Sequence, residues 1–158
     1  MTREQFISET RKCQGQLRRF LTSLCGNTAL ADDIAQEALM RAYVMSGRFS
    51  GKFKAWLFRI AYNCFIDNLR KTRPSVAGLN SAEALRIAGD NEQDEAFRNE
   101  ELQRALLAIP EQERTAIILH YFEDLKINEI ASVMGIPSGT VKYYLSIGRN
   151  HLKELIKL

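Results

Sequence analysis

Cysteine and histidine are scarce in this sequence, which argues against several kinds of site. The 158 residues include three cysteines and two histidines. Cys13, Cys25 and Cys64 are widely spaced and form no C-x-x-C pair, and only His120 and His151 could join them as ligands. A zinc site is therefore not expected, and the thiols are predicted to be free and buried. We expect no metal and no cofactor.

Long apolar runs and catalytic constellations are also missing. No stretch approaches the roughly 18 apolar residues of a membrane span, and the polar N-terminus lacks a signal-peptide core. There is no nucleophile beside a base and no glycine-rich phosphate loop. His120 is expected to be a packed or hydrogen-bonded histidine at the edge of the core. These absences predict a cytoplasmic protein without membrane insertion that is not an enzyme.

Charge is unevenly distributed along the chain, although the net charge is only +3. Residues 1–75 carry thirteen Lys and Arg against six Asp and Glu, residues 76–106 carry three against seven, and residues 107–158 carry six of each. A basic first half points to a polyanionic partner for that part of the chain. The neutral last third gives no such indication.

Two amphipathic helices are predicted first. Residues 4–24 have apolar residues at Phe6, Leu17, Phe20, Leu21 and Leu24, and Gly26-Asn27 should end this helix. Asn27 or Thr28 can cap a second helix, with Asp32 and Asp33 expected in its first turn. The inward positions of this second helix are Ile34, Ala35, Ala38, Leu39 and Ala42, and the outward ones are Asp33, Gln36, Glu37 and Arg41. From the pattern alone, the outward residues are a solvated face.

After the break at residues 47–51, residues 53–73 form the most unusual predicted helix. Leu57, Ile60, Ala61, Cys64 and Leu69 recur at core spacing, and Pro74 is expected to end the helix. Five aromatic residues and six cations share the stretch: Phe53, Trp56, Phe58, Tyr62 and Phe65, with Lys52, Lys54, Arg59, Arg70, Lys71 and Arg73. Cations neutralise phosphates and rings stack on unpaired bases. The pattern leaves open a core helix with solvated ends or a nucleic-acid-binding helix.

Residues 74–94 have the composition of a flexible linker, in which residues 81–89 could form a short helical turn. A helix over residues 95–109 should close at Pro110, and the next helix begins at Glu111. Its expected core residues are Ala116, Ile117, Leu119, His120 and Phe122.

The last segment has the spacing of a helix-turn-helix. Ala131 stands where two helices would cross, Gly135 at the tight turn, and Ile130, Ile136 and Val141 in the shared core. Tyr144 is expected to pack inward. The outward residues of the second helix are Ser138, Thr140, Lys142, Tyr143 and Ser146. The sequence therefore predicts an all-α chain with two small helical domains, 1–73 and 95–158.

Several of these segments resemble the extracytoplasmic-function (ECF) group of the sigma-70 family. Residues 51–73, GKFKAWLFRIAYNCFIDNLRKTR, resemble the segment that melts promoters and binds the minus-ten element, and DDIAQEAL resembles region 2.2. LLAIPEQERTAIILHYFEDL resembles the start of region 4. The recognition helix lacks two arginines that are common in the family, which leaves minus-thirty-five recognition open.

The resemblance implies a sigma factor that binds core RNA polymerase and directs promoter-specific initiation. Its implied partners are the β′ clamp coiled coil, the β flap, promoter DNA and an anti-sigma factor, and the free chain is expected to be a monomer. The implied polymerase contacts are Asp33, Gln36, Glu37 and Arg41. The implied minus-ten and melting residues are Lys52, Phe53, Lys54, Trp56, Arg59, Asn63, Arg70, Lys71 and Arg73. The helix-turn-helix would bind DNA through the outward residues above and Arg149. The alternative is a helix-turn-helix regulator with an N-terminal sensing domain, which leaves the aromatic and basic helix unexplained.

Overall fold

The protein is built from α-helices, as seen in a computed structural model. The structure describes residues 1–76 and 93–156, and the side chains of residues 1–71 and 100–156. The N-terminal module contains α1 (Arg3–Cys25), α2 (Thr28–Met45), the short 3-10 helix η1 (Ser46–Arg48) and α3 (Phe53–Val76). No strand occurs in the described ranges, which agrees with the all-α prediction. The expected helical turn at residues 81–89 and most of the expected linker lie outside the described residues.

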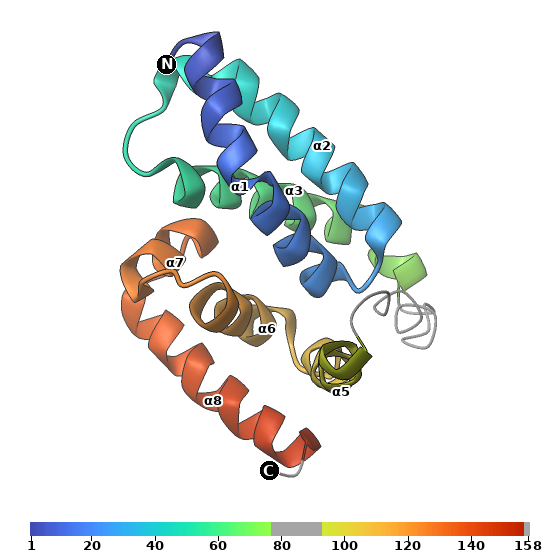
Figure 1. Cartoon of the computed structure of the whole chain (residues 1–158). Coiled ribbons are helices and arrows are strands. Elements are labelled where there is room, and N and C mark those ends of the chain that lie inside the picture. The colour runs from blue at the N-terminus through green and yellow to red at the C-terminus, as the bar shows by residue number, and fades with distance from the viewer. Residues whose placement is uncertain (77–92, 157–158) are drawn as a thin grey trace.

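Helices α1, α2 and α3 pack together (Figure 1). The predicted apolar residues belong to the core that they enclose. Gly26 ends α1 in the left-handed conformation, with φ of 69°. The side chain of Asn27 then caps α2 by accepting a hydrogen bond from the Leu30 N–H at 3.0 Å. Because this cap starts α2 at Thr28, Asp32 and Asp33 lie beyond the first turn, and their expected place there is wrong.

Helix α3 runs through Pro74 and ends at Val76, so the prediction that Pro74 ends it is wrong. Proline lacks an N–H group, but near the end of a long helix this removes only one backbone hydrogen bond. The rest of α3 supplies enough packing to outweigh that loss.

The C-terminal module contains α5 (Gln93–Ala108), α6 (Glu111–Ile117), the π-helical turn η2 (Ile118–Phe122), α7 (Ile127–Met134) and α8 (Ser138–Ile156). The wider π turn, in which the Glu123 N–H donates to the Ile118 carbonyl, shifts the following side chains around the helix axis. Phe122 is therefore 41% exposed, whereas Ile118 is buried. The prediction that Phe122 belongs to the core is wrong for this reason.

The two modules lie directly against each other. Helix α3 contacts α7, and α1 contacts α5, α6 and η2 (Figure 1). Buried apolar side chains of both modules form one contiguous cluster. The face of each module that meets the other therefore combines apolar packing with the polar contacts described below.

Gly148 allows α8 to approach α6 closely. A Cβ at this position would lie 3.2 Å from Ile117 Cγ1 and 3.3 Å from Glu113 Cβ, whereas a Cβ at Gly139 in the same helix meets nothing within 4 Å. We expect Gly148→Ala to lower the free energy of unfolding by about 1 to 2 kcal/mol, and Gly139→Ala to raise it by up to about 1 kcal/mol. Urea denaturation of both variants tests this, and equal effects would contradict the crowding.

Candidate nucleic-acid and polymerase interfaces

Trp56 belongs to a cluster of three aromatic rings at the start of α3. Its ring centroid lies 5.0 Å from that of Phe49 and 5.7 Å from that of Phe53. Phe53 also packs edge-on against Phe6 of α1 and is only 6% exposed. Phe53 is thus buried rather than free to contact DNA, and we correct its expected role to that of a support beneath the half-buried Trp56.

The remaining aromatic residues of α3 belong to the core. Phe58 stacks on Phe20 of α1 with centroids 5.0 Å apart, and Phe65 is 3% exposed. The Tyr62 hydroxyl donates a hydrogen bond to Glu111 Oε2 of α6 at 2.6 Å, and burial, with this carboxylate, raises the pKa of Tyr62. Of the two interpretations that the sequence left open, the structure favours a core role for these rings, because α3 is covered by α1, α2 and the C-terminal module.

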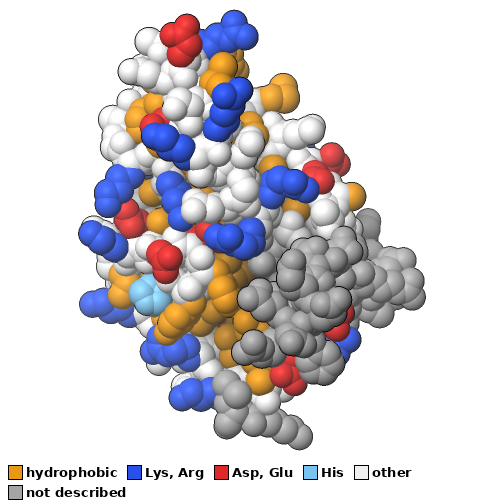
Figure 2. Space-filling model, in the orientation of Figure 1, with side chains coloured by type: hydrophobic (Ala, Val, Ile, Leu, Met, Phe, Trp, Pro, Cys, Tyr) orange, Lys and Arg blue, Asp and Glu red, His pale blue; other side chains and the backbone are white. Residues whose placement is uncertain are grey.

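A stripe of solvent-facing side chains nonetheless runs along the outside of α3. Trp56, Arg59 and Asn63 follow one another at spacings of three and four residues, which places them on one face of the helix. Arg59 and Asn63 are exposed, and so are Arg70 and Lys71 towards the other end. The side chain of Arg73 lies outside the described side chains. Figure 2 shows Lys and Arg distributed over the N-terminal helices and along the edge formed by α7 and α8.

Two further predicted DNA-binding residues are engaged by the C-terminal module. Lys52 Nζ lies 3.0 Å from Glu129 Oε2 of α7. Lys54 Nζ donates to the backbone carbonyl of Glu123 at 2.8 Å and lies 5.6 Å from the Phe58 ring centroid. In this arrangement Lys54 is committed to the C-terminal module, whereas Lys52, whose side chain is 67% exposed, is paired with Glu129 at the surface.

The outer face of α2 carries the four residues predicted to contact polymerase. Asp33, Gln36 and Glu37 are exposed. Arg41 pairs with Glu37 and reaches Asp67 of α3 at 3.5 Å, which ties this face to α3.

Sequence reasoning missed the apolar extension of this α2 face. Met40 is 70% exposed and Val44 is 82% exposed. Both lie in phase with Gln36 at four-residue steps, and this spacing was the available signal. An exposed apolar pair beside acidic residues is typical of a protein-binding surface.

The helix-turn-helix has the predicted geometry. Gly135 ends α7 with φ of 67°, and Ile130 and Val141 are fully buried. Ile136, Ala131 and Tyr144 pack against the same core. Of the predicted DNA-binding residues of α8, Thr140 is half-buried, and the exposed ones are Ser138, Lys142, Tyr143, Ser146 and Arg149. Arg149 Nη1 donates to the Tyr121 hydroxyl at 3.0 Å.

Arg114 of α6 is the main structural residue that sequence reasoning missed. It donates to the carbonyls of Leu106 at 2.8 Å, Ile109 at 3.2 Å and, across the module boundary, Leu24 at 2.8 Å. Burial lowers its pKa. Gln103 makes a similar contact with the Ser23 carbonyl at 2.8 Å. These bonds join the C-terminal end of α1 to α5 and α6.

The cysteines and histidines are packed or hydrogen-bonded within the protein. Cys13 and Cys64 are buried, and burial raises the pKa of Cys25 to about 12. His120 Nδ1 lies 3.3 Å from the Leu125 carbonyl, as expected for a core-edge histidine, and His151 Nδ1 lies 2.6 Å from Glu113 Oε1. Within the described residues, no group of three potential ligands is placed to hold a metal ion. None of the described helices is both long and apolar enough to span a membrane.

Comparison with known families assigns both modules. Residues 10–74 match the family model of Sigma-70 region 2, and residues 99–152 match that of Sigma-70, region 4. The chain belongs to the sigma-70 family of RNA polymerase sigma factors, which direct promoter-specific transcription initiation. A regulator with an N-terminal sensing domain is not favoured, because the N-terminal module is sigma region 2.

Within this family the chain is an ECF sigma factor. It is 35% identical to the ECF sigma factor SigW of Bacillus subtilis, over 85% of this chain and 79% of that protein. It is 32% identical to EcfG of Rhodopseudomonas palustris, over 89% of this chain and 78% of that protein. Among solved structures, RpoE of Bartonella quintana, in complex with the anti-sigma factor NepR, superposes with a TM-score of 0.86 at 29% identity, covering 98% of each chain.

Proposed function

We propose that the stripe on α3 recognises and melts the minus-ten element. The observation that carries this proposal is the exposed alignment of Arg59 and Asn63 with the half-buried Trp56 on a helix whose other face is core. In this proposal Arg59 binds phosphate, Asn63 contacts a base edge, and Trp56 stacks at the edge of the opened DNA. Lys52, Lys54, Arg70, Lys71 and Arg73 supply further positive charge.

The second part of the proposal concerns α8. Residues 1–73 form the minus-ten module, 74–94 the linker and 95–158 the minus-thirty-five module. The residues of α8 proposed to contact DNA are Ser138, Thr140, Lys142, Tyr143, Ser146 and Arg149. Lys142 is the main cation facing outward, so minus-thirty-five binding would rest largely on phosphate contact rather than on bidentate arginine contacts with bases.

The α2 face is proposed to dock on the clamp coiled coil of the β′ subunit. Asp33, Gln36, Glu37 and Arg41 provide polar contacts, and Met40 and Val44 add apolar area. The β flap is the proposed partner of the C-terminal module. The remaining proposals are a monomeric free protein, a cytoplasmic location where polymerase acts, no enzymatic activity, and an anti-sigma partner. The last is supported by the Bartonella relative, solved with NepR.

Charge reversal on α2 tests the polymerase interface. Asp33 is exposed, so Asp33→Lys should leave the helical content unchanged. It should weaken association with core polymerase by roughly tenfold, because the new lysine would face a cation of the partner or leave that cation unpaired. Fluorescence anisotropy with labelled protein measures the affinity, and promoter-dependent transcription measures the consequence. The matched control is Glu101→Lys, which makes the same charge change at an exposed position of α5, away from the α2 face. Equal weakening in both variants, or loss of helical content in Asp33→Lys, would reject the interface.

A further inference from the structure

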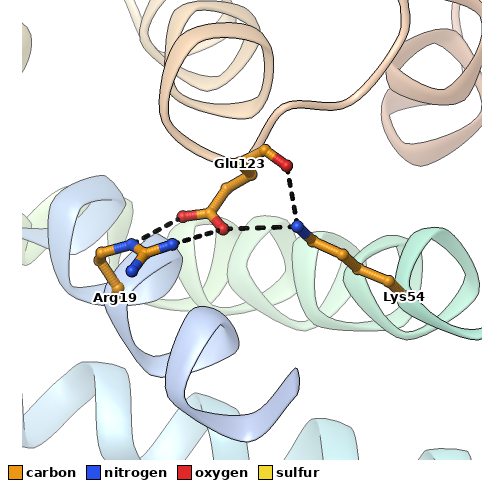
Figure 3. A network of polar contacts seen from close by, with 3 residues as sticks. All are labelled: Arg19, Lys54 and Glu123. Atoms are coloured by element: carbon orange, nitrogen blue, oxygen red, sulfur yellow. Dashed lines mark hydrogen bonds and ion pairs between the residues drawn. The ribbon is translucent and has the colours of Figure 1, made fainter. Parts of the chain in front are cut away.

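Glu123 is a fully buried carboxylate of the C-terminal module that is held by two cations of the N-terminal module (Figure 3). Arg19 of α1 forms two parallel hydrogen bonds, from Nη2 to Oε1 at 3.0 Å and from Nε to Oε2 at 3.1 Å. Lys54 of α3 lies 3.8 Å from Oε1 and donates to the Glu123 backbone carbonyl at 2.8 Å. A buried charge requires such partners, because leaving it unpaired is costly.

Glu129 provides a second acidic contact along the same boundary. Its Oε1 accepts a hydrogen bond from the Lys126 N–H at 2.8 Å, and its Oε2 lies 3.0 Å from Lys52 Nζ. The backbone hydrogen bond from Lys126 lowers the pKa of Glu129, and the ammonium group of Lys52 lowers it further. The carboxylate is therefore ionised and fixed at the N-terminal end of α7.

These acids occupy cations that the proposed function assigns to nucleic acid. Lys52 and Lys54 lie at the start of α3 beside the Trp56 cluster, and a carboxylate or carbonyl of the C-terminal module takes the place of a phosphate at each. Contact with Glu123 and contact with DNA are thus alternatives for Lys54. The outer face of α2, by contrast, keeps Asp33, Gln36 and Glu37 exposed.

The closed arrangement also prevents the chain from reading both promoter elements. Elements centred about 25 base pairs apart are separated by roughly 85 Å along B-DNA at 3.4 Å per base pair. Here α3 packs directly against α7, next to the recognition helix. Initiation at a two-element promoter therefore requires the modules to separate and the contacts of Glu123 to break.

We propose that Arg19, Lys54 and Glu123 form an autoinhibitory latch that holds the modules together and masks the nucleic-acid-binding end of α3. This inference rests on the proposed role of α3. Closure leaves the α2 face exposed, so polymerase can dock before the modules separate. A chain that is open only about a tenth of the time binds single-stranded DNA about tenfold more weakly than its open form does.

The test uses Arg19→Ala in the full chain. Arg19 is outside the proposed DNA-binding and polymerase-binding sets, and its side chain is 55% exposed, so its removal leaves the core intact. The matched control is Arg18→Ala, which removes the same charge from an exposed pair with Asp32 inside the N-terminal module. Small-angle scattering gives the radius of gyration, and fluorescence anisotropy gives the affinity for a single-stranded minus-ten oligonucleotide.

We expect Arg19→Ala to have a larger radius of gyration than Arg18→Ala and to bind the oligonucleotide about five to ten times more tightly. Glu123→Gln, checked for folding by circular dichroism, should act in the same direction because it removes the charge that both cations share. Identical dimensions and affinities for Arg19→Ala and Arg18→Ala would overturn the latch, and expansion of Arg19→Ala without tighter binding than wild type would overturn its masking role. If no variant bound the oligonucleotide while Arg19→Ala still expanded, the role of α3 would be wrong and the latch would stand.

Discussion

Arg114→Ala is expected to lower the free energy of unfolding by about 3 to 5 kcal/mol. Three backbone carbonyls, of Leu106, Ile109 and Leu24, accept hydrogen bonds from this one guanidinium. Alanine would remove this donor from all three in a largely buried position, although the Leu106 carbonyl keeps the Ile109 N–H at 3.4 Å. Each carbonyl left unpaired costs about 1 to 3 kcal/mol where water cannot replace the bond. The effect should be seen as a lower denaturant midpoint in urea unfolding.

Two further variants make the Arg114 test specific. Arg104→Ala removes the same charge from the exposed surface of α5 and should change stability by less than about 0.5 kcal/mol. Arg114→Lys keeps the charge, but its single ammonium cannot reproduce the planar arrangement of donors, so it should fall between the two. If Arg114→Ala were as stable as Arg104→Ala, the three carbonyl contacts would not matter to the fold.

Trp56→Ala is expected to impair promoter opening by about 1 to 3 kcal/mol, which is roughly a 5- to 150-fold loss. The indole ring is half-buried against Phe49 and Phe53, so its remaining edge is supported in a fixed position for stacking on a base at the border of melted DNA. Core polymerase affinity should be nearly unchanged, because the proposed docking face is on α2. Permanganate reactivity of opened thymines measures melting.

The control for Trp56 is Trp56→Phe, which keeps an aromatic ring on the same two neighbours and should retain most of the melting. A parallel loss of polymerase affinity and promoter opening in Trp56→Ala would instead identify a purely structural tryptophan. Thermal unfolding of both variants separates these outcomes, since a core role predicts a lower melting temperature for alanine.

Local sequence was sufficient to predict most helices and their inward faces. The periodic residues of α1, such as Leu17 and Leu24, are fully buried, and Asn27 and Gly135 cap or end helices as their chemistry requires. These features depend on residues a few positions apart, so the sequence displays them directly. The same holds for the helix-turn-helix spacing and for the segments that resemble the sigma-70 family.

Tertiary structure decided which of these residues are free to act. The aromatic residues of α3 are of the kind found in nucleic-acid-binding helices. Packing by other helices nevertheless buries Phe53, Phe58 and Tyr62 and leaves only the ring of Trp56 partly exposed among these four. The bond between Arg19 and Glu123 joins residues 104 positions apart. No periodicity reports such a contact, because it depends on how the two modules are placed against each other. The sequence by itself therefore determined the helices, their faces and the family. The packing of the C-terminal module against α1 and α3 determined whether Arg19, Lys52 and Lys54 pair with acids or remain available to DNA.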